Sequence, residues 1–341
     1  MSGMPHSGSS WMAALHSRLR SDLPSRVPLR SPGWRTRFAP APTGYLHLGH
    51  LVNAVCVWGL ARAHGGDVLL RIEDHDRTRC RPEFEAALLD DLEWLGFAPD
   101  VYPVSSFRPD VAGAETAHPA RQSDQEPRYA AALESLSARG LVYACACTRR
   151  DIAQLVPRAP GEEARYPGTC REAAVDPLAH FARRVRLPDV AVTFEDLRLG
   201  VVTQHPAQQC GDLLVRDRHA QWTYQFAVVV DDMAHDIDVV IRGEDLLGST
   251  GRQWALAALL GRDTPPLTLH HALITHADGS KLSKANRDTS LRELRAAGWS
   301  AERLIGEAAY RAGMLDTARA LPAHAVADLF AASGDHDISA A

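Results

Sequence analysis

The segment from residue 36 to residue 72 constrains the fold most, because it alternates between strand-like and helix-like patterns within a short length. Residues 36–40 have the pattern of a short strand, and residues 51–63 form an apolar helical run that Gly65 and Gly66 end. Residues 67–72 are typical of a buried strand. Two strands joined by a helix form a βαβ unit, whose strands pair in parallel. The sequence therefore predicts an α/β fold built on a parallel sheet.

The rest of the chain continues this alternation. We predict helices at residues 83–95, 129–139 and 250–260, and apolar strands at residues 212–215, 226–230 and 238–241. Residues 142–206 are instead short, turn-rich pieces, which indicates a subdomain inserted between two halves of the sheet. No run approaches the roughly 18 apolar residues that a membrane span requires, so the sequence excludes a membrane protein.

The charge composition limits how the chain can bind a polyanion. Its net charge is −5, so a nucleic acid must be bound by a local basic patch. Lysine and arginine together number 37, yet only Lys281 and Lys284 are lysines. An ammonium is a compact charge on a flexible stem, whereas a guanidinium is a wide planar fork. Because both lysines fall within four residues, this stretch is a candidate for contacts that need an ammonium group.

A second candidate is the sequence HLGH, which spans residues 47–50 at the predicted junction of strand and helix. The first turn of a helix has unpaired N–H groups and the positive end of the helix dipole, so it binds anions. Gly49 lets a ligand approach the backbone, and the imidazoles of His47 and His50 can both bind one phosphate. Together with the two lysines, this segment predicts a nucleotide site.

Residues 37–50 (RFAPAPTGYLHLGH) and residues 281–285 (KLSKA) resemble, as a set, the signatures of class I glutamyl-tRNA synthetases. The resemblance extends from about residue 35 to about residue 298, with a gap at residues 103–120. It implies a Rossmann-like parallel sheet, split by an inserted zinc-binding subdomain of acceptor type and followed by a short helical C-terminus. Because only 57 residues follow Lys284, the chain resembles the truncated branch of that family, the glutamyl-Q tRNA(Asp) synthetases.

The resemblance implies a reaction and its partners. Enzymes of this branch activate L-glutamate with ATP as glutamyl-adenylate and transfer the glutamate to the queuosine base of tRNA(Asp). We therefore expect these three substrates, Mg2+ bound together with ATP, and one structural zinc ion. Six cysteines in a chain of this length are too few for a disulfide scaffold. We expect a cytoplasmic monomer.

The expected division of the chain follows from the same resemblance. It comprises a disordered N-terminal extension (1–34), the first half of the catalytic domain (35–141, with a loop insertion at about 103–127), the inserted zinc-binding subdomain (142–206), the second half of the catalytic domain (207–262), a lysine-loop and helical C-terminal region (263–325) and a tail (326–341).

The resemblance also assigns roles to particular residues. The catalytic group comprises His47, His50, Lys281 and Lys284, and ATP is expected to contact His47, Gly49, His50 and Lys284. Glutamate is expected to contact Arg37, Phe38, Ala39, Pro40, Ala41, Glu73, Tyr224 and Arg242.

The chemistry of glutamate fits this assignment. Glutamate carries two carboxylates and one ammonium, so its site should supply cations for the carboxylates and an anion for the ammonium. Arg37, Arg242 and Tyr224 suit carboxylates, and Glu73 suits the ammonium. Glu73 and Arg242 each follow a predicted strand and so reach the sheet edge where ligands bind, although from the residues alone a surface ion pair is the alternative. Which arginine takes which carboxylate stays open, and Ala41 replaces the usual serine of the family.

Three cysteines form a candidate metal site. Cys145 and Cys147 lie one residue apart, and Cys170 follows 23 residues after Cys147. Thiolates at such spacing bind zinc, although three cysteines can also stay unpaired in a reducing compartment. The resemblance implies zinc with Tyr166 as the fourth ligand; His180 is the alternative, because imidazole is a commoner ligand than phenolate.

Other functions remain open on the sequence. The chain could be a tRNA(Glu)-charging enzyme without an anticodon domain, or a small-molecule adenylyltransferase that shares the HxGH motif. A catalytically inactive module that binds tRNA or glutamate is the alternative outside the enzymes. Release of AMP rather than a stable adenylylated product separates a glutamyl-Q enzyme from such an adenylyltransferase.

Overall fold

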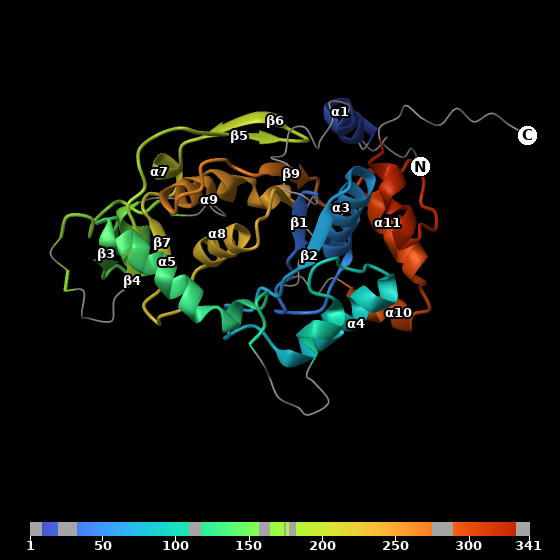
Figure 1. The fold of residues 1–341 in the computed structure, drawn as a ribbon, viewed down its shortest axis with the longest axis horizontal. Coiled ribbons are helices and arrows are strands. Elements are labelled where there is room, and N and C mark those ends of the chain that lie inside the picture. Colours follow the sequence, from blue (N-terminus) through green and yellow to red (C-terminus); the bar gives the residue numbers. More distant parts are fainter. Residues whose placement is uncertain are drawn as a thin grey trace, which may run out of the picture.

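The computed structural model describes residues 9–19, 33–108, 117–156, 164–173, 175–176, 182–274 and 289–331 (Figure 1). The α-helices are α1 (Ser9–Leu19), α3 (Leu48–His64), α4 (Pro82–Leu95), α5 (Glu126–Ala138), α6 (Arg149–Leu155), α7 (Pro206–Gln209), α8 (Tyr224–Ala234), α9 (Leu247–Leu259), α10 (Leu291–Ala296) and α11 (Ala301–Arg311). The 3-10 helices are η1 (Val104–Phe107), η2 (Gln122–Asp124), η3 (Glu244–Leu246) and η5 (Ala323–Leu329). The strands are β1 (Arg35–Phe38), β2 (Asp67–Leu70), β3 (Val142–Cys145), β4 (Ala182–Val185), β5 (Val192–Asp196), β6 (Gly200–Gln204), β7 (Leu213–Arg216), β8 (Val239–Gly243) and β9 (Leu267–His271).

The parallel pairing predicted from the βαβ pattern is confirmed. Strands β1 and β2 pair in parallel and are joined by α3, which ends at Gly65 in the left-handed region. Strands β8 and β9 also pair in parallel, with Arg242 opposite His270. The two pairs meet where the N–H of Asp238 donates to the carbonyl of Arg35 at 2.9 Å. The carboxyl ends of β1, β2 and β8 therefore lie at one edge, which carries Glu73 and Arg242.

The strands do not follow the predicted boundary at residue 206. An antiparallel sheet at one end of the molecule contains β3, β4 and also β7, which lies beyond that boundary (Figure 1). The hairpin of β5 and β6 instead joins the parallel pair β8–β9 through a parallel pairing of β5 with β9. The hairpin thus belongs to the sheet that carries Arg242, and it is physically linked to the candidate site.

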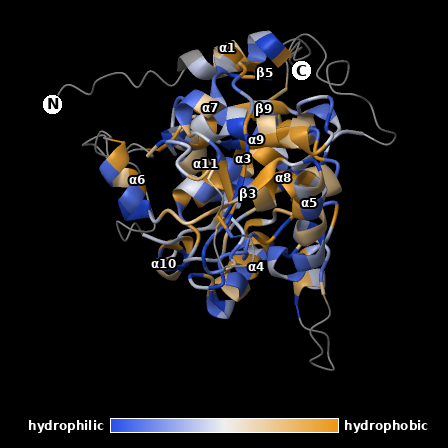
Figure 2. Ribbon diagram, turned by 90° about the vertical axis from the view of Figure 1, so that its left-hand side faces the viewer, coloured by the Kyte–Doolittle hydropathy of each residue, from blue (hydrophilic) through white to orange (hydrophobic). Residues whose placement is uncertain are grey.

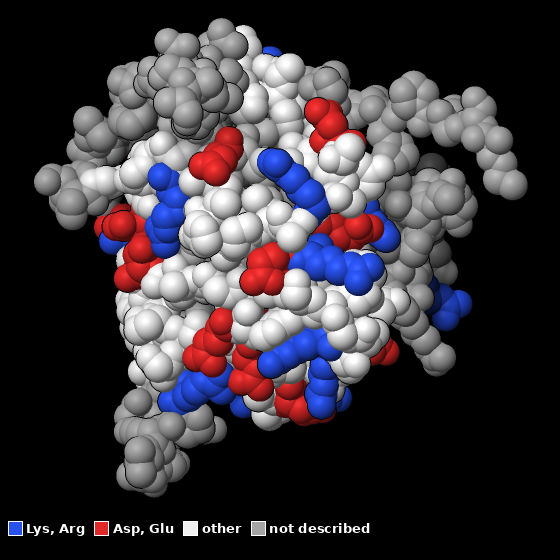
Figure 3. All heavy atoms as spheres, turned by 90° about the vertical axis from the view of Figure 1, so that its right-hand side faces the viewer, with Lys and Arg blue, Asp and Glu red and all other residues white. Residues whose placement is uncertain are grey.

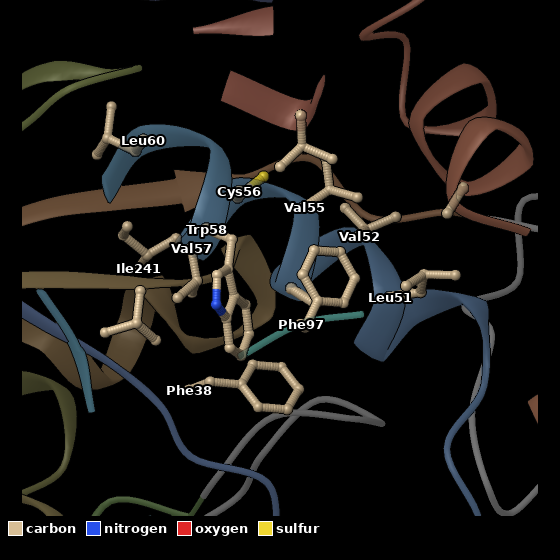
Figure 4. Close-up of a cluster of buried hydrophobic side chains, with 14 of the residues drawn as sticks. Phe38, Leu51, Val52, Val55, Cys56, Val57, Trp58, Leu60, Phe97 and Ile241 are labelled. Carbon is tan, nitrogen blue, oxygen red and sulfur yellow. The ribbon is translucent and has the colours of Figure 1, made fainter. Parts of the chain in front are cut away.

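The core is centred on α3, which is buried along most of its length because it is covered on several sides. Figure 4 shows Trp58 of α3 between Phe38 of β1 and Phe97, with ring centroids 5.2 Å and 4.9 Å away. On another face, Gly59 lies against Phe330, where an added Cβ would come within 2.4 Å of the ring. Such close packing ties the C-terminal residues to the first half of the sheet.

Two predictions about the chain ends are wrong for the residues described. Residues 9–19 form helix α1 rather than part of a disordered extension, with Leu15 fully buried and the indole N–H of Trp11 donating to the carbonyl of Ala312 at 2.8 Å. Residues 326–330 form part of the core rather than a tail, since Val326 and Phe330 are fully buried. In both segments a few large apolar side chains, widely spaced in a polar sequence, are sufficient for docking.

The predicted strand at residues 226–230 is also wrong, because these residues belong to helix α8. Helix α8 contacts α5, α9 and β7, so consecutive residues are buried on different sides of it. Figure 2 shows the hydrophobic residues of α8 and α9 together in the interior. A helix buried on all sides has no apolar stripe, and its run of valines then resembles a buried strand.

Crossing a membrane requires a long apolar helix, and binding a polyanion requires a basic surface. Within the described ranges, no helix combines the length and the apolar character that crossing a bilayer requires. Figure 3 shows that acidic and basic side chains are interspersed on the face that looks to the right in Figure 1. Among the described residues, that face shows no extended basic area that would attract a polyanion.

Candidate active site

The two histidines of HLGH cap helix α3. The Nδ1 atom of His47 accepts the N–H of Gly49 at 3.1 Å, and the Nδ1 atom of His50 accepts the N–H of His47 at 3.2 Å. A neutral imidazole that accepts at Nδ1 carries its proton on Nε2. Each ring therefore presents an Nε2–H donor. An added Cβ at Gly49 would lie 2.9 Å from Cε1 of His47, which explains the glycine between them.

The chain returns to this helix cap directly after the lysine stretch. Ser290 pairs with His47 in an isolated antiparallel bridge, and the N–H of Leu291 donates to the carbonyl of Leu46 at 2.8 Å. Ser290 also caps α10 through a reciprocal pair of hydrogen bonds with Glu293. Lys281 and Lys284 themselves lie outside the described residues, but Ser290 and Leu291, which follow Lys284 by six and seven residues, are fixed beside His47.

A chain of buried ion pairs lies at the carboxyl ends of β1 and β2. Arg71 donates to Glu73 at 2.9 Å and to Asp232 at 2.7 Å, and Arg37 donates to the same oxygen of Asp232 at 3.0 Å. All four side chains are buried, and Arg71 is fully so. Burial alone raises the pKa of Asp232, but Arg37 and Arg71 outweigh this effect and lower the pKa to about 2.

Residues 38–41 run alongside Glu73. The N–H of Glu73 donates to the carbonyl of Pro40 at 3.1 Å, and the N–H of Arg71 donates to the carbonyl of Phe38 at 3.0 Å. Ala39 and Ala41 are half-buried, and the carbonyl of Ala41 accepts the N–H of Thr43. The backbone of residues 38–41 therefore lies beside the backbone at Glu73.

Arg242, at the end of β8, has different partners. Its guanidinium donates to Gln253 Oε1 at 2.7 Å, to Thr250 Oγ1 at 2.8 Å and to His270 Nε2 at 3.2 Å. Tyr224, at the start of α8, lies near enough to affect the pKa of Arg242. Burial raises the pKa of Tyr224 and lowers that of Arg242. Glu73 and Arg242 are thus both buried, and the alternative of a surface ion pair is wrong.

The three predicted cysteine ligands lie together. The Sγ atoms of Cys145, Cys147 and Cys170 lie within 4.8 Å of one another, and those of Cys147 and Cys170 are 3.6 Å apart. Tetrahedral zinc with Zn–S bonds of about 2.3 Å needs sulfur atoms about 3.8 Å apart. The hydroxyl of Tyr166 lies 3.5 Å from Cys145 Sγ and accepts the N–H of Cys170 at 2.8 Å. These residues fit a zinc ion.

Neighbouring residues hold this cluster in shape. The guanidinium of Arg184 donates to Cys145 Sγ at 3.3 Å and lies 3.7 Å from the centre of the Tyr166 ring. Gly211 has a φ of +69°, and an added Cβ would lie 2.1 Å from the carbonyl oxygen of Tyr166. The other candidate ligand, His180, lies outside the described residues.

Residues 34–321 match the family described as tRNA synthetases class I (E and Q), catalytic domain. The chain belongs to this family. It is 43% identical over 267 residues to a glutamyl-Q tRNA(Asp) synthetase of Burkholderia cenocepacia, a match that covers 76% of this chain and 83% of the relative. It is 40% identical over 291 residues to the protein of the same name from Nitratidesulfovibrio vulgaris, covering 82% and 87%.

A solved class I structure has the same architecture. The glutamate-tRNA synthetase from Elizabethkingia anophelis superposes with a TM-score of 0.65 at 26% identity, covering 81% of this chain and 61% of that chain. This synthetase therefore spans less than two thirds of the length of that structure. The predicted class I α/β fold and the predicted resemblance to glutamyl-Q tRNA(Asp) synthetases are confirmed, and the chain is a ligase of the aminoacyl-tRNA synthetase type.

Of the residues predicted for this synthetase, the charged glutamate-binding ones lie at one edge of the parallel sheet, whereas the cysteines cluster at the separate sheet of β3, β4 and β7. Two buried residues beside that edge, Arg71 and Asp232, were not predicted from the sequence. Each carries a signal in the sequence, because Arg71 interrupts the apolar strand 67–72 and Asp232 belongs to the pair of aspartates that follows the apolar run 226–230 of α8. A charged residue inside an apolar run is seldom buried unless it is paired.

Proposed function

We propose that this synthetase activates L-glutamate with ATP and transfers the glutamate to the queuosine base of tRNA(Asp). The observation that carries the proposal is the buried set of Arg37, Glu73 and Arg242 at the sheet edge. Two cations and one anion there match the two carboxylates and the ammonium of glutamate. Relatives that share 43% and 40% identity over most of the chain are named glutamyl-Q tRNA(Asp) synthetases, which supports the choice of acceptor.

The substrate glutamate would lie between the Glu73 carboxylate and the two arginines. Glu73 accepts hydrogen bonds from the ammonium of the substrate. Arg37, Arg242 and the Tyr224 hydroxyl bind the carboxylates of the substrate. The Glu73 carboxylate is already oriented by Arg71 at 2.9 Å. Burial excludes water from these pairs and so strengthens them. The backbone of residues 38–41 lines the same site, where Ala41 offers no hydroxyl.

In the first step, an oxygen of the glutamate α-carboxylate attacks the α-phosphorus of ATP. The bond from this phosphorus to the bridging oxygen breaks, and pyrophosphate leaves. The Nε2–H groups of His47 and His50 donate to the phosphates as charge develops, at the positive end of α3. Mg2+ enters with ATP and neutralises phosphate charge. The chain itself contributes positioning and electrostatic stabilisation.

Lys281 and Lys284 would bind the departing pyrophosphate. Their placement is supported by the bridge between Ser290 and His47, since Lys284 lies only six residues before Ser290. Six extended residues span at most roughly 20 Å, so the ammonium group can reach the α3 cap. Both lysines belong to this proposal and fall outside the described residues.

In the second step, a hydroxyl oxygen of the queuosine base attacks the carbonyl carbon of glutamyl-adenylate, and AMP leaves.

We propose one zinc ion on Cys145, Cys147, Cys170 and Tyr166, with a purely structural role in the subdomain that begins near residue 142. Four protein ligands leave no open position for a substrate. A cytoplasmic location and a monomeric state complete the proposal.

The test is transfer of labelled glutamate to queuosine-containing tRNA(Asp), queuosine-free tRNA(Asp) and tRNA(Glu), assayed side by side. We expect label on the first only. Label on tRNA(Glu) alone would show a charging enzyme without an anticodon domain. AMP release separates both outcomes from a small-molecule adenylyltransferase, and absence of ATP–pyrophosphate exchange would indicate a binding module.

A further inference from the structure

Arg242 differs from Arg37 in the charge of its partners. Arg37 pairs with the carboxylate of Asp232 at 3.0 Å. Arg242 donates instead to His270, Thr250 and Gln253, all of which are uncharged when His270 is neutral. Within the described ranges, no carboxylate lies within 4.0 Å of its guanidinium. A buried cation held only by neutral acceptors retains its affinity for an anion.

This neutral environment depends on the protonation of His270. Its Nδ1 atom lies 2.7 Å from Asp196 Oδ2, and both side chains are fully buried. The same oxygen accepts the N–H of His270 and the hydroxyl of Thr268, each at 3.0 Å. Burial raises the pKa of Asp196. The hydrogen bond from the His270 side chain, together with those from the N–H groups of Leu199 and Arg198, outweighs burial and holds the pKa of Asp196 below its usual range. Asp196 is therefore ionised and can only accept.

Because Asp196 can only accept, the proton of His270 must lie on Nδ1. Burial lowers the pKa of His270, so the ring is neutral and its Nε2 carries a lone pair. That lone pair faces the Arg242 Nε–H at 3.2 Å and the Thr250 hydroxyl at 2.9 Å. The opposite tautomer would direct an N–H toward a guanidinium. Asp196 thus fixes the one tautomer that accepts from Arg242.

We propose that Asp196 and His270 are positioning residues for glutamate. They hold Arg242 in place through a neutral acceptor and leave its positive charge for a carboxylate of the substrate. This inference rests on the proposed role of Arg242 in glutamate binding. It also gives the β5–β6 hairpin, which carries Asp196, a function in the amino-acid site.

The test replaces Asp196→Asn, which preserves size while providing an amide that can donate to Nδ1. His270 can then carry its proton on Nε2, against Arg242. A hydrogen bond to a charged group is worth about 1.5–3 kcal/mol, so KM for glutamate should rise roughly 10- to 100-fold. KM for ATP should stay within about twofold, because no described contact joins Asp196 or His270 to the histidine cap of α3. Both constants come from ATP–pyrophosphate exchange by the full chain.

Matched controls separate positioning from stability. Thr193→Ala removes an exposed hydroxyl pair with Thr203 on the same hairpin and should leave both constants unchanged. Arg242→Gln should raise KM for glutamate at least as much as Asp196→Asn. If Arg242→Gln has no effect, the proposed role of Arg242 fails and this inference fails with it. Suppose instead that Arg242→Gln raises KM for glutamate. If Asp196→Asn then raises KM for glutamate and KM for ATP equally, or raises neither of them, only this inference is overturned.

A measurement on the unaltered protein keeps the proposal testable if Asp196→Asn does not fold. NMR of the full chain with 15N-labelled histidine distinguishes the two neutral tautomers. We expect His270 to be neutral with its proton on Nδ1, and a signal for the Nε2–H tautomer or for a charged ring would refute the proposal.

Discussion

The buried carboxylate of Asp232 gives the sharpest stability prediction. It joins Arg37 and Arg71, and its pKa is about 2 in the folded protein against a reference value of 3.8. Because the folded-state pKa is the lower one, ionisation of Asp232 favours the folded state. The difference corresponds to about 2 kcal/mol, present above about pH 4 and lost as the pH falls through about 2.

The replacement Asp232→Asn should therefore destabilise the protein at neutral pH. Two buried guanidinium groups lose their shared carboxylate, and breaking such a pair costs about 3–5 kcal/mol. We expect the free energy of unfolding at pH 7, measured by urea denaturation, to fall by about 3 kcal/mol. The difference from the unaltered protein should shrink below pH 4, because the natural carboxylate is then lost by protonation.

A surface carboxylate provides the control for this measurement. Asp90 pairs with Arg108 at 2.8 Å, but its side chain is 60% exposed. Asp90→Asn should change the free energy of unfolding by less than about 1 kcal/mol, because solvent screens exposed ion pairs. Equal effects of the two replacements at pH 7, or a difference for Asp232→Asn that persists unchanged to pH 3, would refute the argument.

Four further outcomes follow from the site and the fold. Lys284→Ala should abolish ATP–pyrophosphate exchange while the circular dichroism spectrum is retained; an active variant would remove the lysine from the site. Chelation should release about one zinc ion per chain, and elemental analysis that finds none in the purified protein would reject the metal. Gly211→Ala should weaken zinc retention, measured by competition with a chromogenic chelator, because its Cβ would lie 2.1 Å from the Tyr166 carbonyl oxygen. Trp11→Ala should lower the free energy of unfolding, measured in urea, by about 3 kcal/mol, and an unchanged value would refute the docking of α1.

Local patterns in the sequence were sufficient for the first half of the sheet. The helix that follows His47 and the strand that ends near Glu73 come from unbroken apolar runs bounded by glycine, so periodicity and end signals agree. The helix cap could also be predicted from HLGH, although the hydrogen bonds that each imidazole accepts from a backbone N–H could not. Nδ1 acceptance depends on ring rotation, which sequence spacing does not specify.

Packing between distant segments explains the elements that were predicted wrongly. Residues 226–230 are apolar because α8 is surrounded by α5, α9 and β7, and a fully covered helix loses the period of 3.6. The β5–β6 hairpin was placed in the insertion by its position in the chain. A single parallel pairing, between Asp196 and Thr268, attaches it to the other sheet. Neither outcome is encoded within the segment itself.

The partners of the charged residues show most clearly what local sequence leaves open. Asp231 and Asp232 are adjacent on α8, yet they point into different networks. Asp231 accepts from the Tyr129 hydroxyl at 2.7 Å, and Asp232 accepts from Arg37 and Arg71. Successive helix residues are about 100° apart, so one carboxylate faces α5 and the other faces the sheet edge. Which of them helps to order the proposed glutamate site is decided by where β1 and β2 end, because Arg37 and Arg71 lie 195 and 161 residues from Asp232 in the chain.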